Sequence, residues 1–120
     1  MADNRSGRWG EERAVRYLRL RGWRIEACNY ACRFGEIDVI ASRRGILAFV
    51  EVKTRKDASR GEAREFVTAA KQQRLRSAAA CWLAEHDTAL QPRFDVMEIY
   101  APQGIDTRFP RITLIENAFE

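Results

Sequence analysis

Two carboxylates and a lysine stand in this sequence at positions that a β-hairpin would bring together. Asp38 lies in the apolar segment of residues 35–41, and Glu51 and Lys53 lie in a second apolar segment, residues 46–53. A short turn-forming stretch that contains a glycine joins the two segments. The pattern predicts two antiparallel strands.

The geometry of such a hairpin decides which side chains meet. A turn centred on residues 44–45 places Asp38 opposite Glu51. Directly opposed side chains share one face of a sheet, with Cβ atoms about 5 Å apart. Lys53 lies two residues beyond Glu51 and therefore points to the same face. We expect the two carboxylates and the ammonium group to meet at the end of the sheet away from the turn.

Two carboxylates at this distance raise each other's pKa unless a positive charge compensates them. A hard divalent cation such as Mg²⁺ removes that cost and prefers oxygen ligands. A metal site on Asp38 and Glu51 is therefore one interpretation. A structural ion cluster of Asp38, Glu51 and Lys53 at the end of a sheet is the alternative.

Hydrophobic periodicity predicts the elements that position these residues. An apolar stripe predicts a helix over about residues 9–21, with Glu11 and Glu12 in its first turn, where acids suit the helix dipole. A second helix is predicted from about Thr68, a candidate N-cap, to Glu85. Strands are predicted over residues 23–30, 35–41, 46–53 and 94–100, with a more weakly marked strand at 112–115.

This order of elements predicts an α/β fold with a mixed sheet. The central strands are apolar on both faces, so we expect helices to cover both sides of the sheet. With 120 residues, the chain is expected to form one domain, residues 1–120. It has no apolar run near the roughly 20 residues that span a membrane and no apolar secretory signal, which indicates a cytoplasmic protein.

Charge is distributed unevenly along the chain. The first 76 residues hold 18 Lys and Arg against 10 Asp and Glu, whereas the remainder hold 3 against 7. Arginine accounts for 18 of the 21 basic residues, and its planar fork suits phosphate. The distribution suggests a polyanionic partner such as nucleic acid. Arginines spread over solvated faces explain the same numbers equally well.

Several motifs carry a resemblance to known families. Residues 35–38 and 49–53 resemble the Asp…Glu-x-Lys signature of the restriction-endonuclease-like (PD-(D/E)xK) superfamily. Over about residues 7–100, taken as the core, the chain resembles the YraN-like family of small bacterial proteins. The residues that match this family are Gly7, Gly10, Glu11, Asn29, Tyr30, Arg33, residues 35–38 and 50–53, Lys71 and residues 93–96. Ala70 departs from the pattern, because the family commonly has a proline there.

The resemblance implies a restriction-endonuclease-like fold and a nuclease that hydrolyses phosphodiester bonds of DNA with Mg²⁺ or Mn²⁺. It implies Asp38 and Glu51 as metal ligands, helped by the backbone carbonyl of Val52. It also implies that Lys53 activates the attacking water or stabilises the negative charge that develops on the phosphate. A metal in such a site polarises the phosphoryl oxygen and lowers the pKa of water.

Two further acids are candidates for the same site. Glu11 matches the acid that some members, notably archaeal Holliday-junction resolvases, bring to the metal through water. This likeness suggests branched DNA as substrate, for which a homodimer would supply the two cuts. Glu36 shares a strand face with Asp38 and is a candidate for an additional acid around the metal. The alternatives are a first-turn acid for Glu11 and a solvated strand-end charge for Glu36.

Four basic residues near the predicted site suit phosphate binding. Arg55, Lys56 and Arg60 follow Lys53 along the chain, and Lys71 lies near the N-terminus of the second helix, where anions bind. A generic basic loop and a surface lysine are the alternatives.

At the level of the whole protein, two other interpretations remain open. One is a nucleic-acid-binding module of the same fold without catalysis, and the other is a structural or protein-partner role. The combination of Asp38, Glu51 and Lys53 favours the enzyme, because a pure binder gains little from acids that face phosphate.

Overall fold

The computed structural model describes residues 5–57 and 67–120. Two α-helices, five strands and one short 3₁₀ helix follow one another in these residues. They are α1 (Arg5–Leu20), β1 (Arg24–Cys32), β2 (Gly35–Arg43), β3 (Ile46–Arg55), α2 (Ala69–Glu85), β4 (Gln91–Tyr100), η3 (Gly104–Asp106) and β5 (Arg111–Phe119). Among the described helices, none has both the length and the apolar character needed to cross a membrane.

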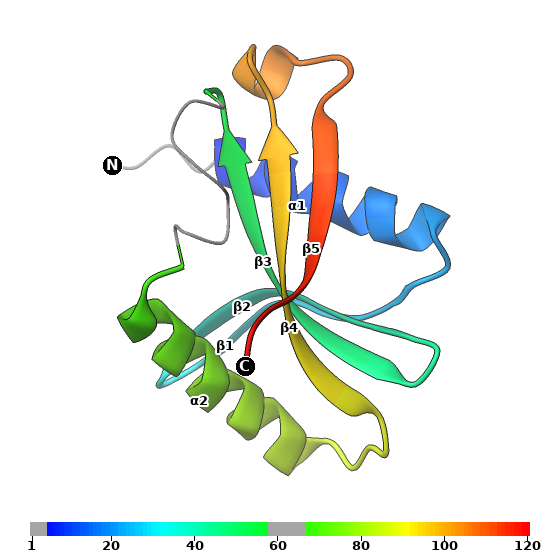
Figure 1. Ribbon diagram of the computed structural model, residues 1–120, viewed down its shortest axis with the longest axis vertical. Helices are drawn as coiled ribbons and strands as arrows, with labels where there is room; N and C mark the ends of the chain where they lie inside the picture. The colour runs from blue at the N-terminus through cyan, green and yellow to red at the C-terminus, as the bar shows by residue number, and fades with distance from the viewer. Residues whose placement is uncertain (1–4, 58–66) are drawn as a thin grey trace.

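The strands form one mixed sheet in the order β1-β2-β3-β4-β5 (Figure 1). Strands β3 and β4 run parallel, and the other neighbours are antiparallel. A parallel pair needs a crossover connection, and α2 lies in that connection. The predicted α/β class, the mixed sheet and the order of elements are confirmed.

Each face of the sheet packs against one helix. On one face, Leu75, Ala78 and Trp82 of α2 contact a cluster that includes Ile40 and Phe49. On the other face, Ala14 and Leu18 of α1 join Val39, Ala41, Ala48, Val50, Met97 and Ile99. Adjacent residues of β2 and β3 therefore face opposite cores, as alternation along a strand requires. This two-sided burial explains why both strands are apolar throughout their middles.

The turn between β2 and β3 is the predicted one. Arg44 and Gly45 both have positive φ, 48° and 82°, as a two-residue type I′ hairpin turn requires. From this turn the pairing runs through Arg43–Ile46 and Ile40–Phe49. Thr68 is the N-cap of α2, as predicted, and its hydroxyl accepts a hydrogen bond from the Lys71 N–H at 3.2 Å.

The first helix begins earlier than its sequence pattern predicts. As described, α1 starts at Arg5, so Glu11 and Glu12 lie beyond its first turn and the prediction that they occupy it is wrong. The residues directly before Trp9 are polar and show no apolar periodicity, yet they form the first turn of the helix. The helix-dipole explanation for Glu11 therefore loses its basis, because the dipole acts mainly on the terminal turn.

Candidate metal centre

The β2–β3 hairpin opens at Asp38. Paired residues run from the turn to Val39–Val50 and stop one pair short of the predicted Asp38–Glu51 pair. At this point Asp38 Oδ2 accepts a hydrogen bond from the backbone N–H of Val52 at 2.8 Å. The Asp38 carboxylate therefore occupies the Val52 N–H, and the backbone pairing of β2 with β3 ends before this point. The same hydrogen bond holds the carboxylate between the two strands.

Strand β2 also changes the faces of its side chains at Asp38. Ile37 and Val39 are two residues apart and would share one face in a regular strand. Instead, Ile37 packs in the α2-side core and Val39 packs in the α1-side core. On the neighbouring strand β1, Asn29 has a positive φ of 53° and lies between the pairs Cys28–Val39 and Tyr30–Ile37, level with Asp38. Irregular backbone in both strands thus surrounds the Asp38 side chain.

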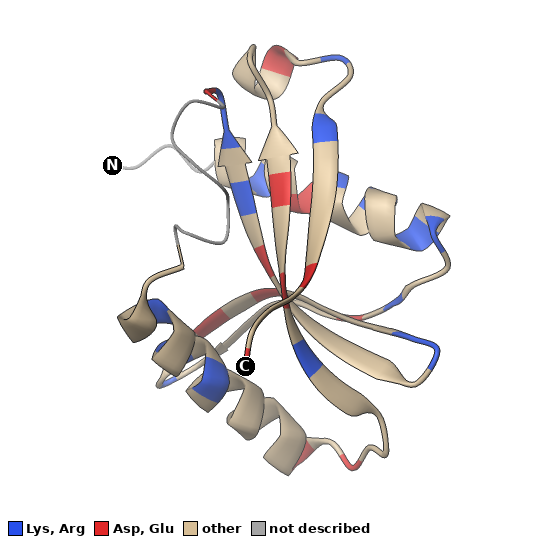
Figure 2. Cartoon of the chain, viewed as in Figure 1, with Lys and Arg blue, Asp and Glu red and all other residues tan. Residues whose placement is uncertain are grey.

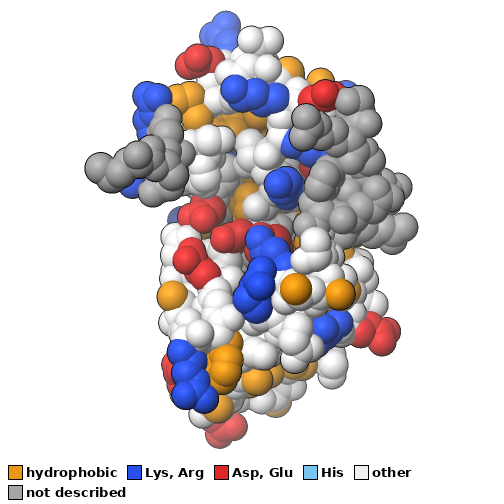
Figure 3. All heavy atoms as spheres, turned by 90° about the vertical axis from the view of Figure 1, so that its left-hand side faces the viewer, with side chains coloured by type: hydrophobic (Ala, Val, Ile, Leu, Met, Phe, Trp, Pro, Cys, Tyr) orange, Lys and Arg blue, Asp and Glu red, His pale blue; other side chains and the backbone are white. Residues whose placement is uncertain are grey.

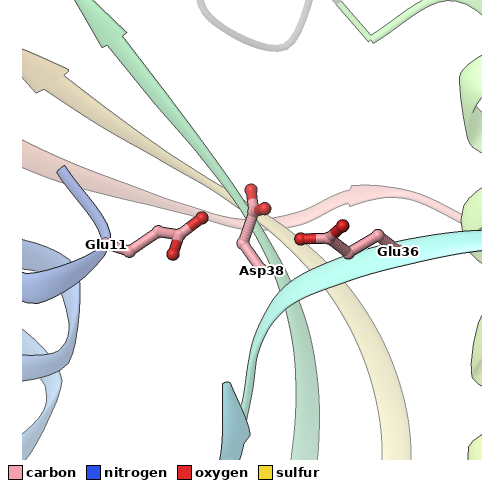
Figure 4. Close-up of side chains that lie close together, drawn as sticks. All are labelled: Glu11, Glu36 and Asp38. Atoms are coloured by element: carbon pink, nitrogen blue, oxygen red, sulfur yellow. The ribbon is translucent and has the colours of Figure 1, made fainter. Parts of the chain in front are cut away.

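Three carboxylates converge at this opening. Glu11 of α1 and Glu36 and Asp38 of β2 have carboxylate oxygens that all lie within 4.8 Å of one another. Figure 4 shows the three side chains pointing toward a common centre from two separate elements. Glu11 and Asp38 are half-buried, whereas Glu36 is exposed, so the group borders on solvent. Oxygen ligands from several acids are the donor set that Mg²⁺ and Mn²⁺ prefer, and the group fits such a cation.

Gly10 allows α1 to bring Glu11 to this point. It is buried inside the helix, and a Cβ at this position would overlap the hydroxyl of Thr54 on β3. Glycine, which has no Cβ, allows this close approach of helix to strand. The residue next to the contact is Glu11, so the placement of its carboxylate depends on the missing side chain at Gly10.

Glu51 lies beside these carboxylates but is held by a different partner. Lys71 Nζ of α2 lies 2.6 Å from Glu51 Oε1, and the Glu51 side chain is 12% exposed. The structure therefore brings together Asp38, Glu11 and Glu36, with Glu51 next to them in an ion pair. Lys53 is exposed, two residues further along β3.

The electrostatic consequence falls on Asp38. Burial, followed by the negative charges of Glu51 and Glu11, raises the pKa of its carboxyl to about 7. The Val52 N–H and the Lys71 ammonium act in the opposite direction and do not compensate. A carboxyl with a pKa this high lies in a site short of positive charge, as is typical of functional sites.

The other predicted residues are spread around this centre. Arg55 pairs with Glu98 of β4 at 3.5 Å and is mostly buried, and Lys56 is exposed. Arg60 lies outside the described residues. Val52 meets Asp38 through its N–H, and a metal contact by its carbonyl oxygen stays a prediction. Figure 3 shows acidic side chains gathered at the middle of one face, with Lys and Arg side chains next to them.

Comparison with known proteins adds the family. Residues 10–99 match the model described as "Uncharacterised protein family UPF0102". The chain belongs to the UPF0102 family. This is the YraN-like family that the motifs indicated, and the matched region contains Glu11, Glu36, Asp38, Glu51 and Lys53. The restriction-endonuclease-like superfamily is consistent with this membership.

Relatives in the UPF0102 family match between 82% and 99% of the chain. A UPF0102 protein of Symbiobacterium thermophilum is 47% identical over 116 residues, 96% of each chain. One of Pelotomaculum thermopropionicum is 42% identical over 122 residues, 99% of this chain and 100% of its own. One of Nocardia farcinica is 48% identical over 99 residues, 82% of this chain and 78% of its own.

Two features of this UPF0102 centre escaped sequence reasoning. The close approach at Gly10 had no signal beyond a glycine inside a helical pattern. The Lys71–Glu51 ion pair joins residues 20 positions apart and depends on how α2 packs.

Proposed function

We propose that this UPF0102 protein is a divalent-metal-dependent nuclease that hydrolyses phosphodiester bonds of DNA. The observation that carries the proposal is the convergence of Glu11, Glu36 and Asp38 on one solvent-bordering point. A purely structural cluster pairs acids with bases, whereas here three acids face one another and the pKa of Asp38 rises to about 7. Such an arrangement costs stability unless a cation joins it.

Each residue has a distinct part in this proposal. Glu11, Glu36 and Asp38 would hold Mg²⁺ or Mn²⁺, with Glu51 beside them. The Val52 N–H orients the Asp38 carboxylate. When bound, the cation supplies polarisation of the phosphoryl oxygen and a lowered pKa of water. Lys53, exposed on the same strand as Glu51, would position the attacking water or donate to the phosphate oxygens.

Charge supports DNA as the substrate. The surplus of basic residues lies in the first 76 residues, which contain α1, the β2–β3 hairpin and the converging carboxylates. The arrival of Glu11 at Asp38 supports the likeness to Holliday-junction resolvases, so we include branched DNA among the substrates to test. Cleavage of a four-way junction requires two cuts, for which a homodimer would supply two sites.

The test uses purified protein with labelled single-stranded, duplex and four-way-junction DNA, with Mg²⁺, Mn²⁺ or a chelator. We expect metal-dependent cutting that Asp38→Asn and Lys53→Ala each reduce by about 100-fold or more, as losses of catalytic groups typically do. Asp87→Asn, at an exposed position after α2, serves as the matched control and should cut normally.

The remaining outcomes separate the alternatives. Salt-sensitive binding without cutting in any metal would support a nucleic-acid-binding module of the same fold. Absence of both binding and cutting on all three DNAs, at low salt and with metal, would contradict every nucleic-acid role. Cutting that Asp38→Asn retains would show that the activity does not come from these carboxylates.

A further inference from the structure

A groove of about 770 Å³ runs between α1 and the edge strand β1. Its walls include three arginines of one helix, Arg8, Arg16 and Arg19, and it reaches Leu20 at the end of that helix. From β1 it includes Cys28 and Asn29. Figure 2 shows basic residues recurring along α1.

The groove is continuous with the metal centre. Glu11 lines the groove and is also one of the three converging carboxylates. Asn29, level with Asp38 on the neighbouring strand, lines it as well. A ligand that lies in the groove therefore reaches the carboxylates at one end.

The length and chemistry of the groove fit a polyanionic strand. The 12 helical steps from Arg8 to Leu20 span about 18 Å at about 1.5 Å each. Phosphates of one B-DNA strand recur about every 3.4 Å along the duplex axis, so this length corresponds to about five nucleotides of a duplex strand. One guanidinium group can donate two parallel hydrogen bonds to the oxygens of a phosphate. Val15 and Leu20, which is 78% exposed, offer apolar contact to sugars and bases.

We propose that this groove holds the DNA strand on one side of the phosphodiester bond that is cut, with Arg16 and Arg19 on its phosphates. The inference rests on the proposed nuclease function and adds the path of the substrate. Glu12 also lines the groove and opposes the bound charge. Glu12→Gln should therefore tighten DNA binding.

Cys28 provides a reporter inside the groove. It is the exposed one of the three cysteines, and partial burial of the thiol raises its pKa, so alkylation is followed at about pH 9. The probe is a 12-mer oligonucleotide, single-stranded or duplex, added to the full chain in Ca²⁺. Peptide mapping by mass spectrometry measures the alkylation rate of Cys28, and fluorescence anisotropy measures binding to the same oligonucleotide. We expect saturating DNA to slow alkylation at least about fivefold.

The binding variants test the same groove independently. The double variant Arg16→Gln/Arg19→Gln should weaken DNA binding about tenfold. It should also reduce the slope of log affinity against log salt concentration by between about 1 and 2, since two phosphate contacts are lost. The control, Arg108→Gln with Arg111→Gln, removes the same charge from exposed positions near β5 and should change affinity less than about twofold.

The outcomes distinguish this inference from the proposed function. DNA that binds, or is cut, while Cys28 stays fully reactive and the Arg16/Arg19 variant binds normally would overturn the groove and leave the nuclease intact. DNA that does not bind the wild-type chain at all would overturn both. Protection of Cys28 that rises with protein concentration in the absence of DNA would assign the groove to a second copy of the chain, and so overturn the DNA path.

Discussion

Asp38 and Asp95 are both aspartates on strands of the same sheet, and their surroundings are opposite. Asp95 is 0% exposed, yet its oxygens accept two hydrogen bonds from Arg93, at 2.8 and 2.9 Å, and one from the Asn117 N–H at 2.9 Å. Asp38 is less buried but accepts one backbone hydrogen bond and faces Glu11, Glu36 and Glu51. One aspartate is neutralised by the fold, and the other is left in need of a positive charge.

The hydrogen-bond and ion-pair partners of the two aspartates separate the structural acid from the functional one. Both lie where a strand is irregular, because β5 has a register shift opposite Phe94–Val96 and β2 changes faces at Asp38. Irregular backbone alone therefore does not mark a site. The hydrogen-bond partners of the carboxylate mark it instead. A carboxylate with a complete set of donors is fixed in place, whereas one with an incomplete set can bind a ligand.

The largest expected effect is on stability at the satisfied aspartate. Asp95→Ala should lower the free energy of unfolding by about 3–5 kcal/mol, because it leaves the mostly buried Arg93 without its bidentate partner. Urea denaturation measures this change against Asp87→Ala, for which we expect less than about 0.5 kcal/mol. If Asp95→Ala lowers the free energy of unfolding no more than Asp87→Ala does, Asp95 does not have this structural role.

The next effect concerns the helix that brings Glu11 to Asp38. Gly10→Ala should cost about 1–3 kcal/mol, because the added methyl group overlaps the Thr54 hydroxyl and forces α1 away from β3. The same shift moves Glu11, so Mn²⁺ affinity should fall too. The matched control is Gly7→Ala in the same helix, where an added Cβ meets nothing within 4 Å. This substitution should leave the free energy of unfolding unchanged or raise it. Identical stability and metal affinity for the two variants would show that Gly10 does not position the centre.

The third effect depends on pH and has the opposite sign to the loss at Asp95. The pKa of Asp38 is raised by folding, from 3.8 to about 7, so its contribution to stability is fully present below about pH 4 and is lost as the pH rises through about 7. Relative to wild type, Asp38→Asn should therefore gain up to about 4 kcal/mol between pH 4 and pH 8 without metal, since the pKa rises by about three units and each unit corresponds to about 1.4 kcal/mol. Thermal denaturation at both values, with Asp87→Asn as control, measures the gain. A wild-type-to-variant difference that is constant with pH would contradict the raised pKa.

Local sequence signals predicted much of the fold. The type I′ turn at Arg44–Gly45 follows from a glycine between two apolar segments, and the cap at Thr68 follows from its hydroxyl before a helical stripe. The five strands follow from alternation and apolar runs. The start of α1 did not, because its first turns are polar and lack an apolar stripe.

The site was predictable only in its residue types and in part of its geometry. The pairing predicted from the turn placed Asp38 opposite Glu51. The observed pairing ends one residue pair earlier, because the Asp38 carboxylate accepts a hydrogen bond from the Val52 N–H. The pairing of Glu51 with Lys71 depends on the docking of α2, which no local pattern encodes. The role of Asp95 depends on Asn117 of β5, 22 residues away. Long-range packing decided each of these contacts.

The central claim is that the carboxylates around Asp38 form a centre for a divalent cation. Isothermal titration of Mn²⁺ into the wild-type chain, Asp38→Asn and Asp87→Asn, near pH 8 and without DNA, tests it most directly. We expect one Mn²⁺ per chain for wild type and Asp87→Asn, and an affinity at least about tenfold weaker for Asp38→Asn. Equal affinity for all three proteins, or no Mn²⁺ binding by the wild-type chain, would contradict it.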